Sequence, residues 1–292
     1  MIIKGSIVAI VTPMHLDGSV DYDGLRRLVD WHIEKGTDAI VSVGTTGESP
    51  TLAVPEHLDV IKVAVAQTAG RIPVIAGAGS NSTAEAIDYT KEAKTLGADA
   101  TLQVVPYYNK PTQEGMYQHF RAIADAVDLP VILYNVPGRT IADMSNDTAL
   151  RLAEIDRVIG IKDATGDMER GKQLIAKAPQ DFAVYSGDDP TAMELMLAGA
   201  QGDISVTANV LPAEMSKLCE LAMAGSVEEA KQLDAKLQPL HSGLFIEPSP
   251  AAAKWALSEM GLIENGIRLP LLPLTNGSIP EVRKMLEDVS AL

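Results

Sequence analysis

The sequence contains very little cysteine. Cys219 is the only cysteine among 292 residues, so an intrachain disulfide and a metal site built from paired cysteines are both excluded. No apolar run approaches the roughly 20 residues that a membrane helix needs. The amino-terminal segment also lacks a basic leader and a small-residue cleavage site, which argues against a signal peptide. We therefore expect a cytoplasmic protein without a membrane partner.

Positive charge is scarce as well. The chain carries 24 Lys and Arg against 39 Asp and Glu, a formal net charge of −15. Such a surface repels a phosphate backbone, so nucleic acid is not an expected partner. The 5 histidines are scattered without the spacing of metal ligands, and we expect no metal. An acidic protein that binds an anionic substrate must gather cations in a cleft, which draws attention to Lys162 and Arg139.

Short apolar, β-branched segments alternate with segments of helical spacing. The apolar segments are nearly continuous rather than alternating, which is typical of parallel strands covered on both faces. Helix starts are marked by capping patterns such as the one at residues 82–85. The predicted strands are 6–13, 39–44, 72–79, 100–106, 130–136, 158–164, 182–189 and 203–210. The predicted helices are 22–34, 55–67, 82–96, 113–126, 146–155, 167–176, 191–197 and 212–223.

This alternation predicts an α/β protein whose catalytic domain, residues 1–224, is a (β/α)₈ TIM barrel. A doubly wound sheet is the weaker alternative, because no complete Gly-rich phosphate loop follows any strand; the glycines of residues 76–79 lack the rest of the pattern. Helical segments at 226–239, 249–260 and 280–288 then follow one another. They predict a C-terminal helical domain, residues 225–292, that covers the barrel or forms an interface.

Reactive groups of a (β/α)₈ barrel gather where its strands end. Lys162 follows the apolar residues 158–161, and burial there favours the uncharged amine, the form that attacks a carbonyl carbon. Tyr134 ends the preceding predicted strand and could move the protons that carbinolamine formation and dehydration require. Each residue also has an ordinary interpretation, a lysine paired with Asp163 and a buried strand tyrosine. Only their combination points to Schiff-base chemistry on a carbonyl substrate.

Two further strand ends supply polar groups. Thr45 and Thr46 lie in a turn bracketed by glycines, which could hold a carboxylate or relay a proton, or serve the turn alone. Arg139 offers a planar fork for a second carboxylate, although a single arginine after Pro-Gly is more often a surface residue or part of an ion pair. Cys219 lies beside apolar residues of a predicted helix, so we expect a buried structural thiol.

Four segments occur together in this sequence: 44–48 (GTTGE), 107–109 (YYN), 134–140 (YNVPGRT) and 160–166 (GIKDATG). In their order and spacing they resemble the dihydrodipicolinate synthase family, and the resemblance extends from residues 5–9 to 245–248. It implies condensation of pyruvate with L-aspartate 4-semialdehyde to 4-hydroxy-tetrahydrodipicolinate, the step that commits material to diaminopimelate and lysine. It also implies that no cofactor takes part and that the enzyme is a homotetramer of two tight dimers.

The resemblance assigns a role to each candidate residue. The catalytic residues would be Lys162, Tyr134, Thr45 and Tyr108, and the substrate-binding residues Thr46, Arg139, Gly187 and Ile204. Lys162 would form the Schiff base, and Thr45 would link the acid/base Tyr134 to Tyr108, which reaches in from a neighbouring subunit. Thr46 would hold the pyruvate carboxylate and Arg139 that of the semialdehyde, while the backbone at Gly187 and Ile204 lines the pocket.

The resemblance also covers a regulatory pocket. In family members that lysine inhibits, the pocket uses positions matching Ser49, Pro50, His57, Asn81, Glu85 and Tyr107. A histidine of some sensitive members is Val54 here, so we expect feedback inhibition to be weak or absent. Two more departures are Asp203, where the family usually has a small apolar residue, and Ser249, which replaces an asparagine. Neither touches the expected chemistry.

Two alternatives differ in what the site does. A sister pyruvate-dependent aldolase, such as an N-acetylneuraminate lyase or a 2-keto-3-deoxy sugar-acid aldolase, would share the lysine and the tyrosine. Arg139 argues against it, because a sugar substrate needs hydroxyl partners where a carboxylate-bearing aldehyde needs a cation. A catalytically inactive barrel that binds a 2-oxo acid is disfavoured, since a binder would not need Lys162, Tyr134, Thr45 and Tyr108 together.

Overall fold

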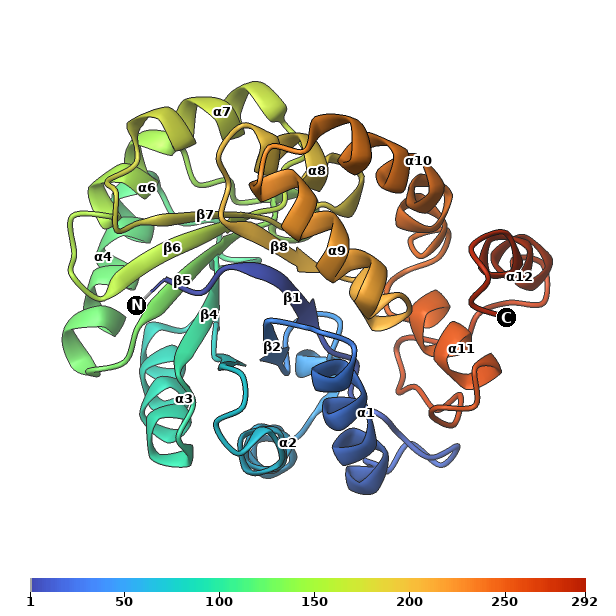
Figure 1. Cartoon of the computed structure of the whole chain (residues 1–292). Helices are drawn as coiled ribbons and strands as arrows, with labels where there is room; N and C mark the ends of the chain where they lie inside the picture. Colours follow the sequence, from blue (N-terminus) through green and yellow to red (C-terminus); the bar gives the residue numbers. More distant parts are fainter. Residues whose placement is uncertain (1) are drawn as a thin grey trace.

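The computed structural model describes residues 2–292. Eight parallel strands pair in sequence order, and the last pairs with the first, so that they close a barrel (Figure 1). The strands are β1 (Gly5–Ala9), β2 (Ala39–Ser42), β3 (Val74–Gly77), β4 (Ala100–Val104), β5 (Val131–Asn135), β6 (Val158–Asp163), β7 (Ala183–Ser186) and β8 (Gly202–Ser205). The predicted (β/α)₈ barrel is confirmed.

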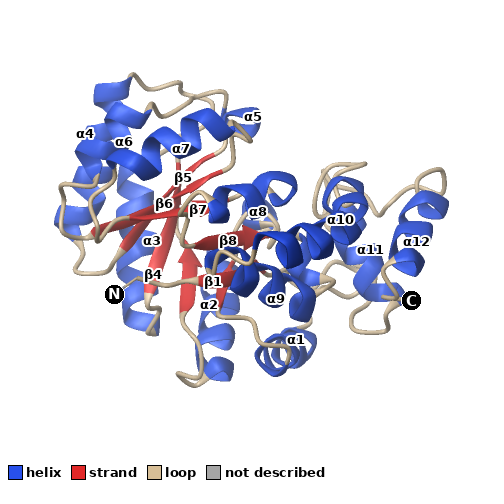
Figure 2. Ribbon diagram, turned by 45° about the horizontal axis from the view of Figure 1, so that its top comes forward, coloured by secondary structure: helices blue, strands red, loops and turns tan. Residues whose placement is uncertain are grey.

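Helices surround the strands (Figure 2). The outer layer consists of α1 (Tyr22–Glu34), α2 (Val54–Thr68), α3 (Thr83–Leu96), α4 (Gln113–Ala126), α6 (Asn146–Leu152), α7 (Met168–Lys177), α8 (Asp189–Leu197) and α9 (Pro212–Met223). Side chains cap several of them, since Asp21, Ser82 and Thr112 each accept a hydrogen bond from a backbone N–H of the first turn. Three short turns, η1 (Ser49–Thr51), α5 (Pro137–Thr140) and η2 (Thr207–Asn209), lie in the strand-to-helix loops.

The predicted strands are too long at their carboxyl ends. The segment 203–210 leaves the sheet after Ser205 and forms η2, and the segment 182–189 ends its strand at Ser186. The hydrophobic pattern continues past each strand because loop residues such as Ala208 and Val210 are also buried. At the carboxyl-terminal mouth of this barrel, apolar sequence therefore marks buried loops as well as strands.

The chain ends in three further helices, α10 (Val227–Gly243), α11 (Ala251–Glu259) and α12 (Ile279–Asp288). They lie to one side of the barrel, with the carboxyl terminus beside α12 (Figure 1). Helix α10 packs on α8 and α9, and α12 packs on α10 and α11. The C-terminal helices are as expected, and we propose the division between residues 224 and 225 as the domain boundary.

Candidate active site

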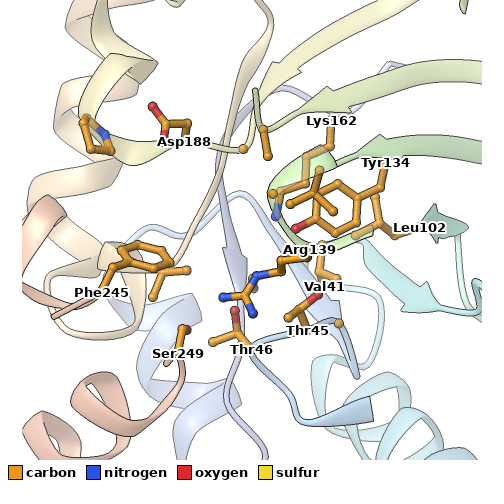
Figure 3. A pocket seen from close by; sticks show the side chains of 18 of the residues that line it. Val41, Thr45, Thr46, Leu102, Tyr134, Arg139, Lys162, Asp188, Phe245 and Ser249 are labelled. Atoms are coloured by element: carbon orange, nitrogen blue, oxygen red, sulfur yellow. The ribbon is translucent and has the colours of Figure 1, made fainter. Parts of the chain in front are cut away.

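A cavity of about 620 Å³ opens at the mouth formed by the strand carboxyl ends. Its lining includes the six predicted site residues Thr45, Thr46, Tyr134, Arg139, Lys162 and Gly187, together with residues that follow β7, β8 and α10. Figure 3 shows the side chains of Lys162, Tyr134 and Arg139 directed toward this cavity. The barrel thus brings together predicted site residues that lie far apart in the sequence, from Thr45 to Gly187.

Lys162 and Tyr134 are neighbours on adjacent strands, because β5 and β6 pair them in register. The Lys162 Nζ atom lies 4.5 Å from the centre of the Tyr134 ring, and the two residues are 5% and 7% exposed. The Asp163 side chain points to the opposite face of β6, where it accepts a hydrogen bond from the Thr165 N–H at 3.1 Å. Among residues 2–292 no carboxylate pairs with Lys162, so the interpretation of a Lys162–Asp163 pair is wrong.

Gly187 provides the space that the Lys162 stem occupies. A Cβ atom at position 187 would lie 2.6 Å from Lys162 Cε and 2.8 Å from its Cγ. Any side chain there would displace the lysine, because real Cβ atoms do not approach this closely. Gly187 therefore shapes the reactive side of the cavity through its missing side chain.

The turn at residues 44–48 carries Thr45 and Thr46 to the cavity. The Glu48 N–H donates to the Thr45 carbonyl at 3.0 Å, and the Thr12 hydroxyl donates to the Gly47 carbonyl at 2.7 Å. Glu48 has a left-handed backbone with φ of +57°, which is unfavourable for a residue other than glycine. Surrounding contacts must hold this turn in its strained conformation.

Arg139 belongs to the short helix α5 and is exposed at the rim of the cavity. No carboxylate among residues 2–292 forms an ion pair with it. Its guanidinium is therefore free to receive an anionic group such as a carboxylate.

Two predicted site residues lie outside the lining of this cavity. Tyr108 is 87% exposed and lies in the loop after β4, with a positive φ of 72°. Ile204 is 1% exposed and belongs to the hydrophobic cluster inside the barrel that also contains Tyr185 and Tyr134. Four residues of the C-terminal segment also line the cavity, namely His241, Ser242, Phe245 and Ser249. None of them was predicted as a site residue, and Ser249, which we expected to lie apart from the chemistry, forms part of the cavity wall.

A second cavity of about 450 Å³ adjoins the first and shares Thr45, Val136 and Arg139 with it. Of the predicted regulatory residues, Ser49, Pro50, His57, Glu85 and Tyr107 line it. Asn81 does not, but its side chain donates to the Tyr107 carbonyl at 3.1 Å. Burial lowers the pKa of His57, whose Nε2–H donates to the Gly77 carbonyl at 2.8 Å. Val54 is 54% exposed and lies outside this lining.

Asp203 is fully buried on the face of β8 opposite to Ile204. No donor from residues 2–292 reaches either of its carboxylate oxygens. Burial raises the pKa of Asp203 well above its usual range, and the charge of the neighbouring Asp189 raises it further. Asp203 does not line the cavity.

No group of three His, Cys, Asp or Glu side chains among residues 2–292 is placed to hold a metal ion. In the same part of the chain, no helix is both long and apolar enough to cross a membrane.

A (β/α)₈ barrel with an unpaired, buried lysine beside a strand tyrosine at its mouth defines the class of Schiff-base-forming lyases and aldolases. The sequence model of the Dihydrodipicolinate synthetase family matches residues 2–289. The chain belongs to this family.

Individual relatives agree with this assignment. The 4-hydroxy-tetrahydrodipicolinate synthase of Herminiimonas arsenicoxydans is 65% identical over 290 residues, which are 99% of each chain. The dihydrodipicolinate synthase of Acinetobacter baumannii, solved with pyruvate, is 60% identical and superimposes with a TM-score of 0.99 over 100% of both chains. The enzyme of Cyanidioschyzon merolae, solved with lysine bound, is 41% identical, with a TM-score of 0.96 over 99% of both chains.

Proposed function

We propose that the chain catalyses the reaction of 4-hydroxy-tetrahydrodipicolinate synthase (EC 4.3.3.7). It condenses pyruvate with L-aspartate 4-semialdehyde in the diaminopimelate pathway to lysine. The observation that carries the proposal is the unpaired Lys162 amine, which faces the cavity 4.5 Å from the Tyr134 ring. Full-length identity of 65% to a synthase of that name supports the same reaction.

Lys162 supplies the covalent chemistry. Its neutral amine attacks the C2 carbonyl of pyruvate, and loss of water leaves a ketimine. Loss of a C3 proton gives an enamine, whose carbon attacks the aldehyde of the semialdehyde. The amino group of the condensed product then displaces Lys162 from C2 and closes the ring. The protonated imine acts as the electron sink, so the protein's own side chains are sufficient.

Proton transfer is assigned to Tyr134, which lies beside Lys162 on the adjacent strand. Thr45 lines the same cavity and would link Tyr134 to Tyr108 of a neighbouring subunit. Hydrogen-bond donors of Thr46 and its turn hold the pyruvate carboxylate, and the Arg139 fork holds that of the semialdehyde.

We also propose a homotetramer made of two tight dimers. Tyr108 supports it, because this residue is 87% exposed in the single chain and lies outside the lining of the cavity that it would have to complete. Sedimentation of the active enzyme should give a tetramer, and an active monomer would contradict the proposal. A single, buried cysteine fits the reducing cytoplasm, which is the location we propose.

Feedback inhibition by lysine is proposed to be weak or absent. The exposed Val54 stands where some sensitive family members have a histidine, although most polar residues of the second cavity are present. Lysine titrated into the assay should leave most activity at physiological concentrations. Strong inhibition there would overturn the proposal.

Borohydride trapping tests the function directly. Reduction in the presence of pyruvate should add one reduced pyruvate to the wild type and none to Lys162→Met, as measured by intact-protein mass. In separate samples that have not been reduced, addition of pyruvate and semialdehyde should give product with the wild type alone. An adduct without turnover of the semialdehyde would point to a sister aldolase. A wild type without an adduct would point to a binding protein.

A further inference from the structure

The C-terminal helices contact the loop that carries Thr45 and Thr46 through a buried ion pair. Lys254 of α11 places its Nζ atom 2.5 Å from Glu48 Oε1, and neither side chain is exposed to solvent. The two residues are 206 positions apart. Glu48 ends the 44–48 turn, so a contact made in the C-terminal region acts directly on a wall of the cavity.

Arg268 adds a second attachment next to the first. Its backbone N–H donates to Glu48 Oε2 at 3.2 Å. Its guanidinium donates to the Thr51 carbonyl at 3.0 Å and to both carboxylate oxygens of Glu56 at 2.8 and 2.7 Å. The loop from Glu48 to Glu56 is therefore held at several points by residues that follow α10.

The local geometry couples the Glu48 side chain to the threonines. Glu48 keeps a left-handed backbone, and its N–H closes the turn on the Thr45 carbonyl. Releasing the side chain would allow the backbone to relax toward a more favourable region. The Thr46 N–H and hydroxyl would move with it, because these atoms lie within the same turn.

Stability is not the main gain from such a pair. Two buried charges lose their hydration, and an apolar pair of similar volume is often equally stable, whereas the ion pair fixes one geometry. The same C-terminal segment reaches the cavity at Ser249, whose side chain is drawn near that of Thr46 in the view of Figure 3. The segment therefore meets the substrate site both directly and through Glu48.

We infer that Glu48 and Lys254 are positioning residues that set the 44–48 turn for the carboxylate of pyruvate. The C-terminal helices are then part of the catalytic unit, because one of them supplies Lys254. This inference rests on the proposed function, in which Thr46 and its turn bind that carboxylate.

The test compares Glu48→Gln and Lys254→Met with the wild type. Glutamine retains an acceptor for the Arg268 N–H but not the charge that binds Lys254. Both variants should raise the KM for pyruvate about tenfold, because they weaken a binding contact. The KM for the semialdehyde should stay within about twofold, since Arg139 is untouched. Half-maximal borohydride trapping should need correspondingly more pyruvate.

Two further variants keep the test decisive. Arg283→Gln removes the Arg283–Glu259 pair between α12 and α11, which does not contact the turn, and should change neither KM. The double variant Glu48→Gln/Lys254→Met contains no buried charge at this place. It should stay folded where a single variant unfolds, and it should still show the raised KM for pyruvate.

A lower Tm with an unchanged KM for pyruvate would overturn the inference, because the pair would then only join two parts of the fold. Equal rises in both KM values would overturn it too, as a sign of general distortion. A wild type that forms no pyruvate adduct would instead overturn the proposed function itself, so the two failures can be told apart.

Discussion

The molecule buries two lysines and uses them differently. Lys162 is 5% exposed and Lys254 is not exposed at all. Lys254 is bound to Glu48, whereas Lys162 has no carboxylate partner within residues 2–292 and faces a cavity beside Tyr134. Burial by itself therefore does not identify a reactive amine. An unpaired amine with room for a substrate does.

Electrostatics follow the same division. Burial lowers the pKa of Lys254, and the adjacent Glu48 charge opposes only part of that change. The Lys254 amine is also hydrogen-bonded to the Glu48 carboxylate and lines neither of the two cavities, so it offers no place for a carbonyl substrate. Replacing each lysine by methionine, which keeps most of the stem volume, separates the two roles.

The largest expected effect is on catalysis by Lys162→Met. Removal of the nucleophile should lower turnover by about 10³-fold or more. The Tm should not fall, since no ion pair is broken. Steady-state assay and borohydride trapping measure the first effect and thermal unfolding the second. Wild-type adduct levels in this variant would remove Lys162 from its assigned role.

Lys254→Met should lower stability in addition to raising the KM for pyruvate, but it should leave the covalent chemistry of Lys162 intact. It leaves the Glu48 carboxylate buried without its cationic partner, which costs about 3–5 kcal/mol in the free energy of unfolding. Urea unfolding measures this loss, and pairing the change with Glu48→Gln should recover most of it. Trapping at saturating pyruvate should still label the protein. If the single variant is as stable as the wild type, the pair is solvated in solution.

Tyr134→Phe tests the role of the tyrosine hydroxyl beside Lys162. The ring remains beside Lys162, but the hydroxyl that moves protons is lost, so kcat should fall by about 10²-fold. Tyr185→Phe is the matched control. The Tyr185 hydroxyl donates to the Ile3 carbonyl at 2.7 Å inside the barrel, and its loss should reduce stability by about 1 kcal/mol without changing kcat. Equal kcat values for the two variants would contradict the assignment.

The smallest expected effect is the dependence of stability on pH that the buried carboxyl group of Asp203 causes. Its pKa is raised in the folded chain from a value near 3.8 when unfolded. The unfolded chain therefore releases this proton first, and the wild type loses stability as the pH rises from about 4 toward the raised pKa. The side chain that Asp203→Asn introduces is neutral at every pH. The difference in Tm between this variant and the wild type should therefore increase, in favour of the variant, over that range. A constant difference between about pH 4 and pH 8 would show that Asp203 is ionised in the fold.

Local patterns predicted the barrel and its reactive pair. Lys162 and Tyr134 could be found because each ends an apolar strand and a parallel barrel brings strand ends together. Glu48 and Lys254 could not, since their contact spans 206 positions and lies outside the strand ladder. Ser249 and Phe245 escaped prediction for the same reason, because the packing of α10 and α11 brings them to the cavity.

The absence of a side chain at Gly187 has a consequence for enzyme design. Lys162 can take its conformation because Gly187, the residue directly after β7, has no Cβ atom, which would otherwise lie 2.6 Å from Lys162 Cε. Placing a lysine at the end of a barrel strand is then insufficient to create an amine catalyst. Transfer of this chemistry to another barrel also requires a glycine beside the lysine, because only a residue without a Cβ atom leaves space for the lysine side chain.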